Sequence, residues 1–413
     1  LATMFKFLVL ASLLASAFAA KSYSGYQVLR VTPQSEDDLT VLSVVEKAIS
    51  EMVDFWKQPR SVGTPVDIMV SPEYRELVLR FIEARGLHVD IMIDDVEKLS
   101  NQQKSRKSPS TSADFDFNNY HSLSEINDWM TSFAASHSSL VSLVDLATSY
   151  EGRTIRALKV GSSSFSSKPV VWLEGGIHSR EWVSPAAMMY MTNMLVEGYG
   201  NDADVTAMLD TVDFYMVINY NPDGYEYTWS NDRMWRKTRS NNVGRICDGV
   251  DPNRNWDFQW GNAGTNPCAD DYQGTYPNSE REVQEVTDYI LGLNDVRVFI
   301  DFHAYSQMWL TPWGYSYRLP SDYNQQYSLA RDAISALSAV YGTDYVYGSI
   351  ANTIYPASGS SVDWAYGVAG IKYSYAVELR DTGRYGFLLP ADQIAPTAIE
   401  TFEAVKVIVK ATM

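Results

Sequence analysis

The sequence contains little cysteine, little histidine and a deficit of positive charge. Only two of its 413 residues are cysteine and five are histidine, and 33 Lys and Arg oppose 50 Asp and Glu, which gives a net charge of -17. So negative a chain is a poor ligand for nucleic acid or for an anionic membrane surface. No Asn-x-Ser/Thr sequon occurs, so N-glycosylation is not expected. After the first twenty residues no apolar run approaches the ~20 residues of a membrane span.

The first residues differ in composition from everything that follows. Met4 and a lysine precede an apolar run over residues 7–14, and the small residues of Ala17-Phe18-Ala19 suit a cleavage site. This pattern is typical of a secretory signal peptide. We therefore expect residues 1–19 to be signal peptide and leader, and the product to be secreted, extracellular and free in solution.

Secretion bears on the two cysteines, Cys247 and Cys268. An oxidising compartment leaves few thiols unpaired, so a disulfide between them is favoured over two free buried thiols.

The chain is longer than the ~300 residues at which single cores stop growing, which predicts two units. Two strand-helix-strand patterns over about residues 26–99 resemble a small open α/β sandwich with an antiparallel sheet. From about residue 119 onward, apolar strands alternate with helices. Strands are expected over residues 169–176, 213–221, 296–306, 345–350 and 371–380, with Pro222-Asp-Gly as a turn. This alternation predicts an α/β fold whose mixed, largely parallel sheet lies between two layers of helices.

The two units are joined by a polar, Ser-rich stretch over about residues 98–117. It carries Lys104, Arg106 and Lys107 and is expected to be exposed, which favours cleavage by a trypsin-like protease. An inert linker explains the same composition equally well.

His178 and His303 follow the two most apolar strands, and Glu181 lies three residues after His178. Zinc favours two imidazoles and a carboxylate with a fourth position left open. Ligands of α/β folds gather at the carboxyl ends of strands, so these side chains could share a metal. His-x-x-Glu alone is weak evidence, because such matches arise by chance and both histidines could be ordinary core residues.

A carboxylate and several arginines accompany these histidines. Alternation along residues 371–380 places Glu378 opposite the apolar face of its strand, where a carboxylate needs a partner or a task. Accepting a proton from a water acidified by zinc is one such task, and a buried salt bridge is the alternative. Arg236 and Arg254 carry the fork geometry that recognises a carboxylate.

Six blocks together resemble the zinc metallocarboxypeptidases of the pancreatic A/B type, in that family's order and near its spacing. They are His178-Ser-Arg-Glu181, "RMWRKTRS", "DPNRNWD", "HAYSQ", "IYPASGSSVDW" and "ELRDTGRYGFLLP". The likeness covers about residue 117 to the end of the chain, and residues 26 to about 107 resemble the family's inhibitory pro-segment. It implies an inhibitory pro-domain over 20–99, an activation linker over 100–116 cut near Arg106 or Lys107, and a catalytic domain over 117–413.

The resemblance assigns a role to each matching residue. It implies that His178, Glu181 and His303 bind one Zn²⁺ per chain, and that Glu378 is the general base. Arg236 matches the arginine that stabilises the oxyanion. Substrate-binding roles fall on six positions: Asn253, Arg254 and Tyr355 for the terminal carboxylate, and Arg180, Tyr305 and Phe387 for further contacts. Asp251 matches a carboxylate that orients a zinc-bound histidine.

The family's selectivity depends on the position that matches Val362, where an acidic residue selects Lys or Arg. The expected pocket residues carry no carboxylate: Val362, Ala357, Ile350, Gly314 and Ala376. We therefore expect a monomeric, A-like carboxypeptidase zymogen that removes apolar or aromatic C-terminal residues, with digestion as its setting. The alternatives are a B-type preference for Lys or Arg and a catalytically silent protein that binds peptide termini. Two departures from the family are Ala304, where relatives often have Ser, and Pro356, which follows Tyr355 and stiffens that loop.

Overall fold

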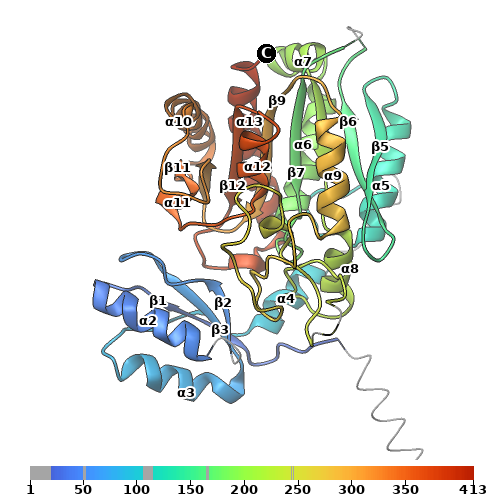
Figure 1. The fold of residues 1–413 in the computed structure, drawn as a ribbon. Helices are drawn as coiled ribbons and strands as arrows, with labels where there is room; N and C mark the ends of the chain where they lie inside the picture. Colours follow the sequence, from blue (N-terminus) through green and yellow to red (C-terminus); the bar gives the residue numbers. More distant parts are fainter. Residues whose placement is uncertain (1–19, 50–52, 106–114, 164–166, 243, 245) are drawn as a thin grey trace, which may run out of the picture.

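The computed structural model describes residues 20–49, 53–105, 115–163, 167–242, 244 and 246–413. They form an N-terminal unit (residues 20–105) and a larger C-terminal unit (residues 115–413) that lie against each other (Figure 1). The expected signal peptide over residues 1–19 and the candidate cleavage residues Arg106 and Lys107 lie outside the described residues.

The N-terminal unit is an antiparallel four-stranded sheet, in the order β2-β3-β1-β4, with two helices on one face. Alternation along β1 divides its side chains: Leu29 and Val31 pack on the helices, whereas Val28 belongs to the core shared with the C-terminal unit. The open α/β sandwich expected from the sequence is therefore confirmed. Its elements are β1 (Gln27–Val31), α2 (Glu36–Ile49), β2 (Val53–Lys57), β3 (Val66–Val70), α3 (Pro72–Glu83) and β4 (Asp90–Ile93).

Helix α4 (Val96–Lys104) runs into the stretch expected to be a linker from residue 100 onward. Asp95 begins the helix by accepting a hydrogen bond from the backbone N–H of Lys98 at 3.0 Å. Gln103 is buried and donates to the carbonyl oxygens of Phe387 (3.3 Å) and Leu389 (2.9 Å). These partners lie nearly three hundred residues away, so composition alone could not reveal that this polar segment is helical and docked.

The C-terminal unit contains an eight-stranded mixed sheet in the order β11-β10-β12-β9-β7-β8-β6-β5. Pairings β11/β10, β12/β9, β9/β7 and β7/β8 are parallel, and the remaining three are antiparallel. The expected mixed and largely parallel sheet is confirmed. Its strands are β5 (Val141–Thr148), β6 (Thr154–Val160), β7 (Val170–Gly175), β8 (Asp213–Val217), β9 (Val296–Ala304), β10 (Met308–Thr311), β11 (Val346–Ser349) and β12 (Tyr373–Leu379).

Helices cover both faces of this sheet (Figure 1). One core joins the sheet to five helices: α5 (Leu123–Ser136), α6 (Val183–Gly198), α7 (Ala203–Thr211), α10 (Tyr323–Tyr341) and α13 (Ile394–Lys410). The other face packs on α9 (Arg281–Leu291) and α12 (Ser361–Gly367). Because alternate residues of a strand face opposite layers, Val377 lies in the first core and Ala376 in the second. Among the described residues, no helix is both long and apolar enough to cross a bilayer.

Two local expectations from the sequence are wrong. Pro222-Asp-Gly is the first turn of helix α8 (Pro222–Ser230), because the side chain of Asn221 caps it by accepting from the N–H of Gly224 at 3.0 Å. Ile350, expected at the end of a strand, begins the short helix α11 (Ile350–Thr353) instead.

Candidate active site

His178, Glu181 and His303 come together at the adjacent carboxyl ends of β7 and β9. His178 and Glu181 lie in the turn between β7 and α6, and His303 is near the end of β9. All three are buried, and their candidate ligand atoms lie within 4.8 Å of one another. The distances are 2.9 Å from His178 Nδ1 to Glu181 Oε1 and 3.3 Å from His303 Nδ1 to Glu181 Oε2. Three metal-ligating groups of the expected kinds therefore face one point.

The other ring nitrogen of each histidine contacts a carboxylate. His178 Nε2 lies 3.1 Å from Asp251 Oδ1, and His303 Nε2 lies 2.9 Å from Asp301 Oδ2. When Nε2 carries the proton, Nδ1 presents its lone pair to the common point. Burial alone would raise the pKa of Glu181. The charges and hydrogen bonds of His178 and His303 lower it by more, so the pKa lies below its ordinary value. The donor set fits a zinc ion, which takes two imidazoles and a carboxylate with one open position.

Arg236 is fixed beside this point by Asp251. Its Nη2 and Nε lie 2.8 Å and 3.2 Å from Asp251 Oδ2, and its Nη1 lies 3.7 Å from Glu181 Oε1. Burial opposes the charge of Asp251, but Arg236 and His178 hold the pKa of this carboxyl well below its usual range. One carboxylate thus orients both a candidate metal ligand and the arginine next to it.

Glu378 lies on β12 directly across from His303 in the parallel pairing with β9. Its side chain is half-buried and lines the same cavity as His178, His303 and Arg236. Burial raises the pKa of Glu378 to about 7; the negative charge of Glu181 adds to this rise, and the positive charge of Arg236 opposes it. A carboxyl with this pKa beside a metal ligand set is suited to exchange protons near neutral pH.

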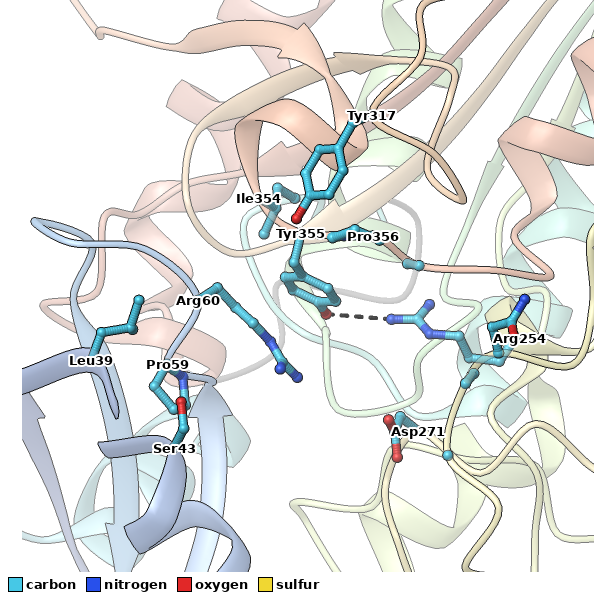
Figure 2. Close-up of a pocket in the computed structure, with 14 residues that line it drawn as sticks. Leu39, Ser43, Pro59, Arg60, Arg254, Asp271, Tyr317, Ile354, Tyr355 and Pro356 are labelled. Carbon is cyan, nitrogen blue, oxygen red and sulfur yellow. Dashed lines mark hydrogen bonds between the residues drawn. The ribbon is translucent and has the colours of Figure 1, made fainter. Parts of the chain in front are cut away.

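The residues expected to hold a terminal carboxylate, Asn253, Arg254 and Tyr355, line the same cavity. Asn253 and Arg254 belong to a single 3₁₀ turn (Pro252–Arg254), and Arg254 Nη2 donates to the hydroxyl of Tyr355 at 3.4 Å (Figure 2). Arg254 is also fixed by a bond from Nη1 to the carbonyl oxygen of Asn253 at 2.8 Å. The three side chains that the sequence assigned to one task are therefore neighbours.

The whole cavity has a volume of about 370 Å³. Small and apolar residues line one part of it, which we call the recess. Of the expected pocket residues, Val362, Ala357, Ile350 and Ala376 line it, and Gly314 supports its wall. A Cβ at Gly314 would lie 3.0 Å from the carbonyl oxygen of Ala357. Met308, Leu310, Thr353 and Ile354 are among the lining residues that were not expected from the sequence.

Strand β2 of the N-terminal unit lies over the cavity. Asp54 Oδ2 is 3.1 Å from Arg180 Nη1, which also lies 3.0 Å from Asp270. The ring of Trp56 packs against both Tyr305 and Phe387, with centroid distances of 6.5 Å and 5.0 Å. The residues that sequence analysis assigned to further substrate contacts are therefore covered by the N-terminal unit.

Arg60, just after β2, extends into the carboxylate-binding region (Figure 2). Its guanidinium lies over the ring of Tyr355, 4.7 Å from the centroid, while Arg254 contacts the hydroxyl of the same residue. A neighbouring polar cavity of about 480 Å³ is lined by Arg60, Arg254, Asp271 and Tyr355. The sequence did not indicate any of these contacts between the units.

The loop that follows Arg236 is closed by the Cys247–Cys268 disulfide, with a Cα–Cα distance of 5.1 Å, so the expected pairing is confirmed. Sequence analysis missed Asp301, which contacts His303. The signal was present, because residues two apart on a strand share a face, and "FIDFH" therefore places both side chains together.

Comparisons with known proteins identify the family of both units. The profile of the zinc carboxypeptidase family matches residues 126–404, and that of the carboxypeptidase activation peptide matches residues 29–103. The chain belongs to the zinc carboxypeptidase family. It is 42% identical to carboxypeptidase A1 of Sus scrofa over 99% of both chains, and 42% identical to carboxypeptidase A2 of Rattus norvegicus over 98% of this chain and 97% of the relative.

Solved carboxypeptidase structures share the fold of both units. Thrombin activatable fibrinolysis inhibitor superposes with a TM-score of 0.87 at 34% identity, covering 94% of this chain and 98% of that one. Carboxypeptidase A from Helicoverpa armigera gives a TM-score of 0.85 at 29% identity, covering 95% and 98%. This zinc carboxypeptidase is therefore a zymogen of the A type, with its activation peptide in the N-terminal unit and zinc as its metal.

Proposed function

We propose that this zymogen, once cleaved, hydrolyses the last peptide bond of peptides that end in an apolar or aromatic residue. The observation that supports this most strongly is the layout of one cavity. Its lining includes two of the metal ligands and Glu378, and also Arg254, Asn253 and Tyr355 beside an uncharged recess. A peptide whose carboxylate is bound by the second group would place its last peptide bond near the first.

His178, Glu181 and His303 would hold the zinc ion through two imidazole nitrogens and a carboxylate. When bound, zinc supplies a Lewis acid that polarises a carbonyl oxygen and makes a nearby water more acidic.

The chain's own residues account for the remaining chemistry. Arg254, Asn253 and Tyr355 bind the terminal carboxylate, which fixes the scissile bond in place before reaction. Glu378 accepts a proton from the attacking water and then donates it to the leaving amine. Arg236, held by Asp251, donates hydrogen bonds to the oxygen on which negative charge develops.

The recess favours an A-type preference over a B-type one. Val362, Ile350 and Ala376 offer no charge to a lysine side chain, which would lose its hydration there without compensation. Asp270, which also lines the cavity, is already paired with Arg180 at 3.0 Å. A silent binding protein is disfavoured because the candidate base and the ligand set are all present in one place.

The N-terminal unit is proposed to inhibit by covering the cleft, since Trp56, Arg60 and Asp54 occupy substrate-contacting surfaces. A trypsin-like protease cutting near Arg106 or Lys107 is the proposed activator. Lys104 is a poorer target, because it ends helix α4 and its ammonium group donates to the carbonyl oxygen of Trp229 at 3.3 Å. We further propose a secreted monomer that acts extracellularly in digestion, which suits the disulfide and the net charge of -17.

A substrate panel tests the proposed function. The full chain and trypsin-treated chain are assayed on peptides ending in Phe, Leu, Lys or Glu, each with a free or an amidated C terminus, with and without a chelator. We expect the treated chain to release Phe and Leu from free termini only, and to lose activity when metal is removed. Equal rates before and after trypsin would contradict inhibition by the N-terminal unit. Cleavage of amidated peptides would contradict recognition of the carboxylate.

Introducing an acid into the recess should change its selectivity. In Val362→Asp, preference for C-terminal Lys over Phe is expected to rise at least about tenfold, because a close buried charge pair can contribute ~1.5 kcal/mol or more. The ratio of kcat/KM values for the two peptides measures this. Val362→Asn is the matched control, since it has nearly the same shape as Asp without the charge. An equal change in both variants would show that polarity alone, and not charge, alters selectivity.

A further inference from the structure

Asp301 is a fully buried carboxylate on β9, two residues before the metal ligand His303. Its Oδ2 lies 2.9 Å from His303 Nε2. Among the described residues no lysine or arginine forms an ion pair with it, whereas Asp251, behind the other histidine, also pairs with Arg236. An isolated buried carboxylate is costly, so one kept here needs a specific partner. The imidazole of His303 is that partner.

The same oxygen of Asp301 connects His303 to the substrate-binding side of the cavity. Ser361 Oγ, at the start of α12, donates to Oδ2 at 2.7 Å. Asn253 Nδ2 lies 3.5 Å from the same oxygen of Asp301, and Asn253 Oδ1 accepts from the backbone N–H of Ser361 at 2.8 Å. Ser361 precedes Val362 of the recess. These contacts join a metal ligand, a residue proposed to bind the substrate carboxylate, and the start of α12.

A second buried carboxylate lies beside Asp301 but does not contact the metal site. Glu174 is its register partner on β7, is fully buried, and accepts from Trp172 Nε1 at 2.7 Å. Burial first, and then the charge of Asp301, raises the pKa of Glu174 well above its ordinary value. Of these two equally buried carboxylates on adjacent strands, Asp301 contacts a metal ligand and Glu174 does not.

We propose that Asp301 is a positioning residue that holds the proton of His303 on Nε2 and leaves Nδ1 free for zinc. This inference rests on the proposed metal site but not on the proposed peptidase activity. A carboxylate acceptor fixes the imidazole tautomer and raises its basicity, and losing such a partner typically weakens metal affinity about 10- to 100-fold.

The test measures zinc affinity of the full-length chain without substrate, by competition with a chromophoric chelator. The variants are Asp301→Ala, Asp301→Asn and Ser361→Ala, with Glu174→Gln as a control of matched burial. Folding is checked by circular dichroism and thermal unfolding. Cobalt(II) substitution gives a second readout, because its visible absorption reports the geometry of the ligands directly. Since no peptide is cleaved, the result is independent of whether the proposed peptidase activity is correct.

Zinc affinity should fall about 10- to 100-fold in Asp301→Ala, less in Asp301→Asn, and change little in Ser361→Ala and Glu174→Gln. The cobalt spectrum should change only in the Asp301 variants. Unchanged affinity in Asp301→Ala, or an equal loss in Glu174→Gln, would overturn the proposal. If Asp301→Ala does not fold, Asp301→Asn decides: a loss greater than that of Glu174→Gln supports the role, and an equal value overturns it.

Discussion

Glu378→Gln is expected to lower kcat of the activated chain by about 10²- to 10⁴-fold, with KM little changed. An amide has nearly the size of the carboxylate, so the recess and the carboxylate-binding residues keep their places. It cannot accept the proton of the attacking water or return it to the leaving amine, and general acid–base catalysis typically contributes this factor. Steady-state kinetics on a peptide ending in Phe measure both constants. A large rise in KM with kcat intact would assign Glu378 to binding instead.

The pH profile provides the control for this variant. Burial raises the pKa of Glu378 to about 7, and activity requires its charged form. Activity should therefore fall as the pH falls through that pKa. Two charges change in the activated enzyme: Lys57, whose positive charge opposes the rise, leaves with the N-terminal unit, and zinc adds a stronger positive charge nearby. The acid limb of kcat/KM is thus expected at or below pH 7, and this limb should be absent from Glu378→Gln.

The sequence predicted the parts of this molecule that depend on local periodicity and on spacing. Strands β7, β9 and β12 are strongly apolar. A residue that can bind metal or exchange protons lies near the end of each strand: His178, His303 and Glu378, respectively. Parallel strands bring their carboxyl ends to one edge, so the two histidines could be expected to share a metal, whereas the role of Glu378 followed from the resemblance to the carboxypeptidase family. The small N-terminal sandwich was predictable for the same reason, because two short strand-helix-strand patterns fit only a small sheet.

What the sequence could not predict depends on contacts between distant segments. The sequence of helix α4 is polar enough to resemble a linker. The helix is docked because Gln103 contacts Arg233, Phe387 and Leu389, which belong to distant parts of the chain. Nothing in the strand β2 pattern indicates that Trp56 covers Phe387 or that Asp54 pairs with Arg180. These are tertiary contacts, and they override the composition from which local structure is inferred.

Asp301 is an intermediate case. Alternation along β9 placed it on the same face as His303, but only the structure reveals that no lysine or arginine competes for it among the described residues. The evidence that Asp301 positions His303 therefore comes from its contacts in the folded protein and not from the sequence pattern. The same holds for Asp251, whose two oxygens serve different partners, His178 and Arg236.

Arg236→Ala is expected to lower kcat about 10²- to 10³-fold, the usual cost of removing one donor to a developing oxyanion. Its Nη2 and Nε are fixed on Asp251 Oδ2 at 2.8 Å and 3.2 Å, so the guanidinium is positioned before substrate binds and needs no reorganisation during reaction. KM should change less than kcat, because the charge that Arg236 stabilises is largest in the transition state.

The alanine variant also leaves the buried charge of Asp251 without its arginine, and breaking a buried ion pair can cost ~3–5 kcal/mol of stability. Arg236→Lys is therefore the matched variant, since it keeps a positive charge near Asp251 but loses the fork that can serve Asp251 and substrate together. We expect Arg236→Lys to unfold close to the temperature of the unchanged chain and still to lose much of its kcat. A lysine variant with full kcat would show that only the charge matters, because the geometry of the donors would then contribute nothing to the reaction. Zinc affinity, measured by chelator competition, should stay near that of the unchanged chain in Arg236→Lys, which separates loss of the donor from loss of the metal.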